Sequence, residues 1–201
     1  MAYRGMKLGY VIAALVLAIA VIMLITFTIL TGHKASYVVI GLVKVPMSVP
    51  RMTVSSVFTN GSQIPINYTC NGLDYSIPLY ISNVPGNAKS LMVIMEDLNA
   101  PGGVFIHWVL YDIPPNITEL PQGIPAQYYV PGIGYQGIND FGKIGYGGPC
   151  PPPGPPHEYV IIVLALDREL PPLNESDVYL IRSISVGDVV SYGVLIGYYG
   201  G

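Results

Sequence analysis

The sequence has few charged residues and no basic cluster. Lysine and arginine number 9, and aspartate and glutamate number 12, so charged residues make up only 10% of the 201 residues. All twelve acidic residues lie at or after Asp74, and the six basic residues beyond residue 35 are scattered. Proteins that bind nucleic acid present a concentrated positive surface to the phosphate backbone. The composition therefore argues against nucleic acid as a partner.

Common catalytic motifs are also missing. The chain has no Gly-x-Ser-x-Gly elbow, no His-Glu-x-x-His pair and no phosphate-binding P-loop. Asp97, His107 and His157 carry side chains suited to acid–base chemistry, but no nucleophile with an obvious base is readable beside them. We therefore expect a binding protein that needs no cofactor, and not an enzyme.

Cysteine is scarce, with Cys70 and Cys150 as the two examples in the chain. Outside the cell, two cysteines most simply form one disulfide bond. The alternative is a pair of small buried side chains that never meet. We expect the disulfide, while the sequence leaves the alternative open.

One long segment lacks charge altogether. Residues 8–32 are uncharged, and a helix of that length covers roughly 35 Å, enough to cross a bilayer core. A cleavable signal would have a shorter apolar region and a small-residue cleavage site after it, and no convincing site follows. A buried core helix is disfavoured because the segment is apolar on every face. We predict a transmembrane signal anchor at 8–32.

The anchor divides the chain into a short cytoplasmic end at 1–7, a juxtamembrane linker at 33–51 and a domain at 52–201. We expect this domain to face outside the cell membrane, because it contains four N-glycosylation sequons, which mark surface loops of secreted proteins. The predicted acceptor residues are Asn60, Asn67, Asn116 and Asn174.

The sequence of this domain predicts a mainly β fold. Short β-branched or aromatic runs, such as "SLMVIMED", "FIHWVLYDIP" and "EYVIIVLALD", are bounded by Gly, Pro, Asn and Asp. Two of the runs are almost continuously apolar, which indicates strands covered on both faces. Residues 174–199 have apolar residues at mixed spacing and predict a short C-terminal helix or two.

Residues 121–156 are rich in Gly, Pro and Tyr. Such composition suits a disordered linker. However, the segment contains aromatic residues and joins two strong strands, and long loops inside compact domains are usually functional. We expect an ordered binding loop.

His107 lies in the apolar run 105–114, beside the only tryptophan. Strand alternation predicts that Phe105, His107, Val109 and Tyr111 share one face. A short turn between two strands brings Asp97 to the same end of the sheet as His107. His157 opens the next strong strand, and Tyr159 points the same way. Without further context, a histidine in an apolar strand is more often a satisfied core residue.

Five motifs supply that context. In order they are "EDLNAPGG", "HWVLYDIPP", "GINDFG", "GYGGPCPPPG" and "HEYV…ALD". Together they closely resemble the phosphatidylethanolamine-binding protein family, in its bacterial and archaeal Raf-kinase-inhibitor-like branch. The likeness extends from about Met52 to the C-terminus. It implies a compact, mostly antiparallel β fold with a small surface pocket for anions such as phospholipid headgroups.

By motif, the resemblance implies a pocket of Asp97, His107, His157 and Tyr159, walled by the loop at Gly148 and Pro149. Two departures affect its charge: Asn99 replaces a carboxylate, and Glu158 replaces an arginine. Imidazoles, a tyrosine hydroxyl and backbone N–H groups suit a buried anion, which needs donors directed at it. Asp97 would accept from one ring nitrogen and fix that ring's tautomer. Acidic conditions should then strengthen anion binding.

Two alternatives remain. Some family members inhibit serine proteases or kinases, so a tethered serine protease inhibitor is possible; a kinase partner does not suit the outer side of a membrane. Two histidines and Asp97 also match a metal site with two imidazoles and one carboxylate, although Asn99 removes a possible ligand.

Overall fold

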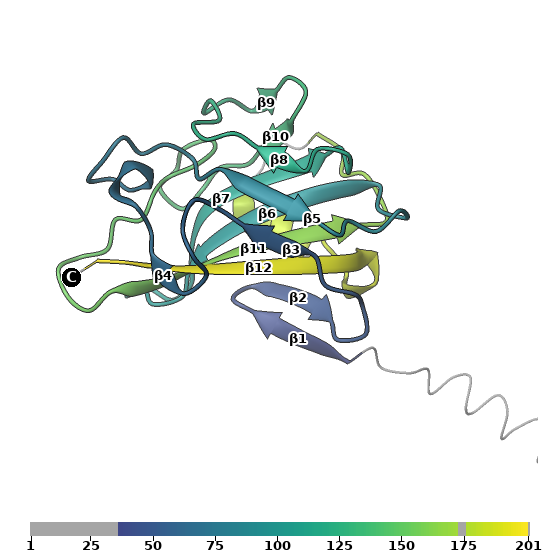
Figure 1. Cartoon of the computed structure of the whole chain (residues 1–201), viewed down its shortest axis with the longest axis horizontal. Helices are drawn as coiled ribbons and strands as arrows, with labels where there is room; N and C mark the ends of the chain where they lie inside the picture. Colours follow the sequence, from purple (N-terminus) through teal and green to yellow (C-terminus); the bar gives the residue numbers. More distant parts are fainter. Residues whose placement is uncertain (1–35, 173–175, 201) are drawn as a thin grey trace, which may run out of the picture. The chain divides into compact units, whose positions relative to one another are not determined.

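The strands form a seven-stranded sheet, a three-stranded sheet and a two-stranded hairpin (Figure 1). The computed structural model describes residues 36–172 and 176–200. The large sheet has the order β4-β12-β11-β6-β7-β10-β9, the small one β3-β5-β8, and the hairpin β1-β2. Neighbouring strands are antiparallel except β4 and β12. The mainly antiparallel β fold with little helix, expected from the sequence, is confirmed.

The elements have the following bounds: β1 Tyr37–Ile40, β2 Val43–Pro46, β3 Thr53–Ser55, β4 Ser62–Gln63, η1 Ile66–Tyr68, β5 Leu79–Ser82, β6 Ser90–Asp97, β7 Phe105–Ile113, β8 Glu119–Leu120, β9 Tyr129–Val130, β10 Gly134–Gln136, β11 His157–Leu166, α2 Asp177–Arg182, η2 Val186–Asp188 and β12 Val189–Tyr199.

The large sheet is the middle layer of the domain. Every residue of β6 is buried, and its side chains alternate between two hydrophobic clusters. Leu91 and Val93 pack with side chains of the small sheet, whereas Met92 and Ile94 pack with side chains of α2 and β2. Because both faces are covered, β6 and its neighbour β11 are apolar almost throughout, as their sequences indicated.

A β-bulge interrupts the pairing of β6 and β7 at His107. Met95 pairs with Trp108 and Glu96 with Ile106, so His107 has no partner on β6. The predicted common face of Phe105, His107, Val109 and Tyr111 is therefore wrong: Val109 and Tyr111 belong to the cluster under α2. An extra residue in one strand shifts the alternation beyond it and redirects a side chain, which is why the simple period of two fails.

The C-terminal segment is mostly a strand. Helix α2 and the short η2 match the predicted helices, but residues 189–199 form β12, which pairs with β11 along its length. β-Branched and aromatic residues favour a paired strand, and the long apolar edge of β11 supplies the partner.

The predicted linker at 33–51 also needs correction over most of its length. Residues 37–46 form the β1–β2 hairpin, and Val43 and Val45 are buried in the cluster shared with α2. The described domain begins at Ser36 instead of Met52.

The predicted anchor at 8–32 and the end at 1–7 lie outside the described residues. Within 36–172 and 176–200, no helix has both the length and the apolar character needed to cross a bilayer.

Two carboxyl groups are buried on the α2 side of the large sheet. Burial raises the pKa of Glu96 to about 7, although the Leu42 amide, which donates to its carboxyl oxygens, opposes the shift. Burial, followed by the charge of Asp140, raises the pKa of Asp177 to about 8, partly offset by the Val109 amide. Neither oxygen of Asp177 has a hydrogen-bonding partner of good geometry among the described residues.

We predict that Asp177→Asn stabilises the protein at alkaline pH. The ordinary carboxyl pKa of 3.8 rises to about 8 on folding, so folding favours the protonated form and wild-type stability falls as pH rises from about 4 through 8. The amide has no proton to lose. Its free energy of unfolding, from urea denaturation, should exceed that of the wild type by on the order of 2 kcal/mol at pH 8.5 and by little at pH 4.

The exposed Asp167 provides the control, because Asp167→Asn makes the same substitution at a residue that folding does not bury. If the free energy of unfolding of Asp177→Asn changed with pH in parallel with that of the wild type, the raised pKa of Asp177 would be contradicted. In both variants the free energy of unfolding should still decrease somewhat with rising pH, because the pKa of Glu96 is also raised by folding.

Candidate functional site

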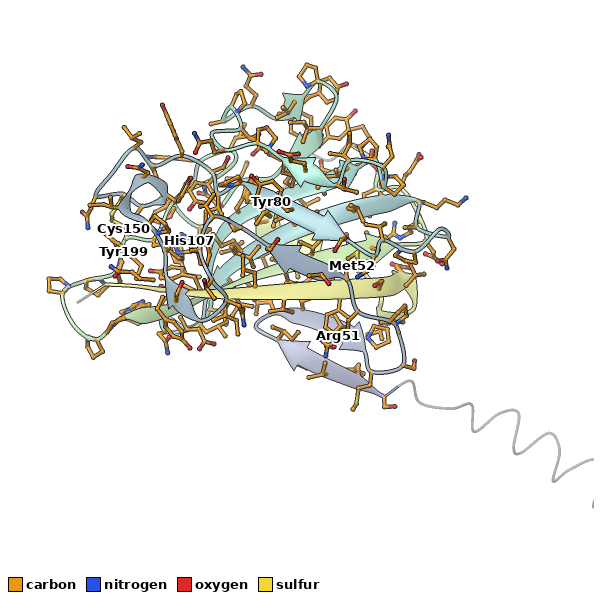
Figure 2. All side chains as sticks on the ribbon, in the orientation of Figure 1. Arg51, Met52, Tyr80, His107, Cys150 and Tyr199 are labelled. Carbon is orange, nitrogen blue, oxygen red and sulfur yellow. A yellow bond between two sulfur atoms is a disulfide. The ribbon has the colours of Figure 1, made fainter. Side chains whose placement is uncertain are left out.

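A cavity of about 150 Å³ opens at one end of the large sheet. It lies where β6 ends and where β7 and β11 begin, and Figure 2 labels two of its residues, His107 and Cys150. Its lining is mostly apolar and consists of Asp97, Ala100, Pro101, Phe105, His107, Phe141, Cys150, Pro151, Pro152 and His157. The two histidines and the carboxylate singled out in the sequence thus line one cavity.

Strand pairing places these groups together. Asp97, the last residue of β6, pairs with Phe105 on one side and with Tyr159 on the other. His157, two residues before Tyr159, therefore lies beside the end of β6. The bulge in β7 directs His107 to the same place. His157 is 50 residues from His107 and 60 from Asp97 in the sequence. The three side chains meet because β6 ends where β7 and β11 begin.

Asp97 and His157 form the one ion-pairing contact of the cavity. His157 Nδ1 lies 2.7 Å from Asp97 Oδ2, and the Asn99 amide donates to Asp97 Oδ1 at 2.8 Å. A carboxylate only accepts, so we assign the Nδ1 hydrogen to His157. This leaves Nε2 of His157 as an acceptor in the neutral ring and a donor in the charged ring.

His107 is fixed in the same tautomer by a different partner. Its Nδ1 lies 2.7 Å from the carbonyl oxygen of Gly147, which also only accepts. Burial lowers the pKa of His107 below 6.5, while the Gly147 carbonyl and the charge of Asp97 oppose this shift. His107 is therefore neutral at pH 7, with Nε2 as an acceptor.

Aromatic rings surround His107. The ring centroids of Phe105, Phe141 and Tyr159 lie 5.1, 5.3 and 5.2 Å from that of His107. Phe105 and Phe141 also pack edge to face at 4.7 Å. These contacts hold the imidazole in one orientation and exclude water from its sides.

The loop that supplies Phe141 is organised by Asn139, a buried residue that the sequence analysis did not single out. Asn139 Oδ1 accepts from the amides of Phe141 and Lys143, and Nδ2 donates to the carbonyl of Gly145. The loop is joined to β7 by paired contacts between Asp140 and Ile106. The segment 121–156 thus contributes an ordered wall.

Gly148 and Pro149, the predicted wall, are not among the residues that line this cavity. Gly148 lines the neighbouring cavity, and its backbone lies within reach of the His107 ring. The Gly148 amide donates to Asp74, and the Pro149 carbonyl accepts from the Cys70 amide. Cys150 and the two prolines after it form the wall instead. Cys70 and Cys150 are joined by a disulfide bond, which fixes this segment to the loop after η1.

Tyr159 lies beside His107 but does not line the cavity, contrary to the expectation from the motif. Its hydroxyl is fully buried and has no hydrogen-bonding partner of good geometry among the described residues. Burial and then the charge of Asp97 raise its pKa well above the usual value of 10. The ring of Tyr159 packs against that of His107, while its hydroxyl lies near Asp97 and Cys150, two residues that line the cavity.

The two departures from the family pattern have structural roles. Asn99 Oδ1 accepts from the Glu158 amide at 2.7 Å, which fastens the β6–β7 turn to β11. Glu158 Oε2 accepts from the Tyr198 hydroxyl at 2.6 Å, so this carboxylate faces away from the cavity. Glu158 therefore does not add its charge to the site.

A neighbouring cavity of about 250 Å³ shares Phe141 and Cys150 with the first. Lys143 and Asp74 contribute its charges. The sequence analysis missed Phe141 and Lys143, although the quoted motif "GINDFG" contained the former.

The metal alternative finds no support in the side-chain arrangement. Within the described part of the chain, no group of three or more His, Cys, Asp or Glu side chains is placed to hold a metal ion. The Nδ1 atom of each histidine is already engaged, and Asp97 is shared with His157.

Comparison with known proteins agrees with this architecture. The family model described as phosphatidylethanolamine-binding protein matches residues 54–200. The chain belongs to this family. A UPF0098 protein of Pyrococcus horikoshii is 46% identical over 151 residues, covering 74% of this chain and 76% of the relative. One from Archaeoglobus fulgidus is 44% identical, and the match spans 74% of this chain but only 50% of that relative.

Solved structures give the same result. A phosphatidylethanolamine-binding protein homologue from Chlamydia trachomatis superposes with a TM-score of 0.67 at 35% identity, over 75% of this chain and 98% of that one. YbcL of Escherichia coli, described as a member of the mammalian PEBP family, gives 0.66 at 29% identity, over 75% and 99%.

The remaining sequence predictions stay predictions. The sequon residues Asn60, Asn67 and Asn116 are exposed, and Asn174 lies outside the described residues. Neither the glycosylation, the outward orientation nor a serine protease partner is tested by the geometry.

We predict that the double variant Cys70→Ser/Cys150→Ser loses about 4 kcal/mol of unfolding free energy, because the disulfide closes a loop of 80 residues in the unfolded chain. Urea denaturation measures this loss. Wild-type protein treated with reductant should show the same decrease. Equal stability of the variant and the untreated wild type would show that the bond contributes nothing to stability.

Proposed function

We propose that this protein binds small phosphate-type anions, including phospholipid headgroups, in the cavity between His107 and His157. The observation that carries the proposal is the convergence of two imidazoles, from different strands, with each Nδ1 engaged by the protein. The fixed Nδ1 contacts leave both Nε2 atoms available to a ligand. Membership of the phosphatidylethanolamine-binding protein family supports the same ligand class.

An anion needs hydrogen-bond donors. The neutral His107 ring offers Nε2 as an acceptor, whereas the charged ring offers Nε2 as a donor, which suits an anion. Burial of His107 opposes its protonation. Anion binding should therefore be strongest under acidic conditions.

The size of the cavity favours a headgroup over a whole lipid. Its volume of about 150 Å³ is below the ~300 Å³ typical of the smallest sites for drug-sized ligands. Phosphate or phosphoethanolamine is of suitable size, and acyl chains would remain outside. The proline and phenylalanine side chains would limit access of water and so strengthen charge interactions inside.

We further propose binding without catalysis. The lining offers no hydroxyl or free thiol, since Cys150 is in the disulfide. In the cell, we propose that residues 8–32 anchor the protein in the membrane with this domain outside.

Calorimetric titration tests the ligand class. Affinity for inorganic phosphate and phosphoethanolamine should fall about tenfold or more between pH 5 and pH 8, because His107 is neutral at the higher pH and its Nε2 no longer donates. His157→Gln should weaken binding at pH 5 by a similar factor, since it removes one of the two imidazoles that line the cavity.

Glu158→Gln is the matched control. It changes the neighbouring residue, but its carboxylate contacts Tyr198 and faces away from the cavity, so affinity should not change. Binding that is independent of pH, or equally weakened by both variants, would overturn the proposed site. Phosphoethanolamine binding without phosphate binding would indicate a headgroup-specific site.

A further inference from the structure

The β1–β2 hairpin lies outside the part of the chain that matches the family model. It occupies residues 37–46, whereas the match begins at residue 54. In sequence it stands between the uncharged run 8–32 and the matched region.

The inner strand of the hairpin is firmly attached. Val43 and Val45 of β2 are buried in the cluster that includes Ile94 and Leu180, and β2 lies against β12 and η2. At the turn, the Leu42 amide lies 3.2 Å from both carboxyl oxygens of the buried Glu96. The hairpin is thus held at a fixed place on the domain.

The outer strand exposes large apolar side chains. Tyr37 is 48% exposed and Val39 54%, and Met47, just after β2, is 66% exposed. Val38 and Leu42 are exposed as well. A cluster of large apolar side chains exposed on one hairpin is typical of an interaction surface, because exposing apolar area to water is unfavourable.

The chain connection limits what this surface can meet. Tyr37 follows Gly32 by five residues, and five residues span at most about 18 Å when fully extended. If 8–32 crosses a bilayer, the start of β1 must therefore lie close to the lipid headgroups.

Charge favours the same partner. No acidic residue precedes Asp74, whereas Lys34, Lys44 and Arg51 flank or belong to the hairpin region. The Lys44 ammonium lies 5.6 Å from the Tyr37 ring centroid, which combines a cation with an aromatic group. Exposed apolar and tyrosine side chains with nearby cations suit the interface of a membrane that contains anionic lipid.

We propose that the β1–β2 hairpin inserts its exposed side chains into the headgroup region of the bilayer and so fixes the distance and orientation of the domain. This proposal rests on the anchoring part of the proposed function and is independent of the anion site. The hairpin then serves as a rigid spacer, in place of the flexible linker that the sequence suggested.

The test uses the full chain reconstituted in phosphatidylcholine vesicles with a fraction of anionic lipid. Val39→Trp places a fluorophore on β1, and Tyr129→Trp places one on β9, at the far edge of the large sheet, where Tyr129 is 50% exposed. Emission of each variant is compared between vesicles with and without bromine near the glycerol end of the acyl chains. The unsubstituted chain gives the background of the buried Trp108.

The Val39→Trp signal should fall about twofold in brominated vesicles, because interfacial side chains reach the boundary of the acyl region. The Tyr129→Trp signal should not change. Both positions are exposed, so neither substitution should disturb the fold. Circular dichroism spectra that match the wild type would confirm this.

Other outcomes overturn the proposal in distinguishable ways. Unquenched Val39→Trp in chains that float with the vesicles would reject the hairpin contact but keep the anchor. If such chains also cross-link as pairs through β1, the surface is covered by a second copy. Chains that do not float would reject both the anchor and the hairpin contact.

Discussion

The hydrogen bond between Asp97 and His157 is the contact on which the site depends. It joins the end of β6 to the start of β11 at 2.7 Å, and it exists because these strands pair in a register that places Asp97 opposite Tyr159. The bond orients the imidazole, which lines the cavity. A shift of register by one residue would turn His157 to the other face and would remove the site.

Burial disfavours the charged form of ionisable groups on both sides of the large sheet. On the α2 side, burial raises the pKa of Glu96 and Asp177, so folding favours their protonated forms. On the cavity side, burial lowers the pKa of His107, so an anion must offset the cost of charging that ring. Acid therefore stabilises the folded state through Glu96 and Asp177 and destabilises it through the buried His107.

The large sheet also divides the roles of its two faces. One face ends in the cavity and packs against the small sheet, and the other accepts α2 and the hairpin. Glu96 and Asp97 are adjacent, yet alternation directs Glu96 to the hairpin turn and Asp97 to the cavity. Of these two consecutive carboxylates, one thus contacts the hairpin and the other lines the cavity.

The sequence by itself determined the central strands, the mainly β class and the family. It also singled out the two histidines and Asp97, which the structure brings together around one cavity. These follow from local patterns: apolar runs define strands, and ordered motifs define the family. Tertiary structure decided the rest. The bulge at His107 depends on pairing with β6, the strand at 189–199 depends on the edge of β11, and the wall at Cys150 depends on where Gly148 and Pro149 find their hydrogen bonds. Each of these is set by partners distant in the chain, and a local pattern carries no information about which partner a residue will meet.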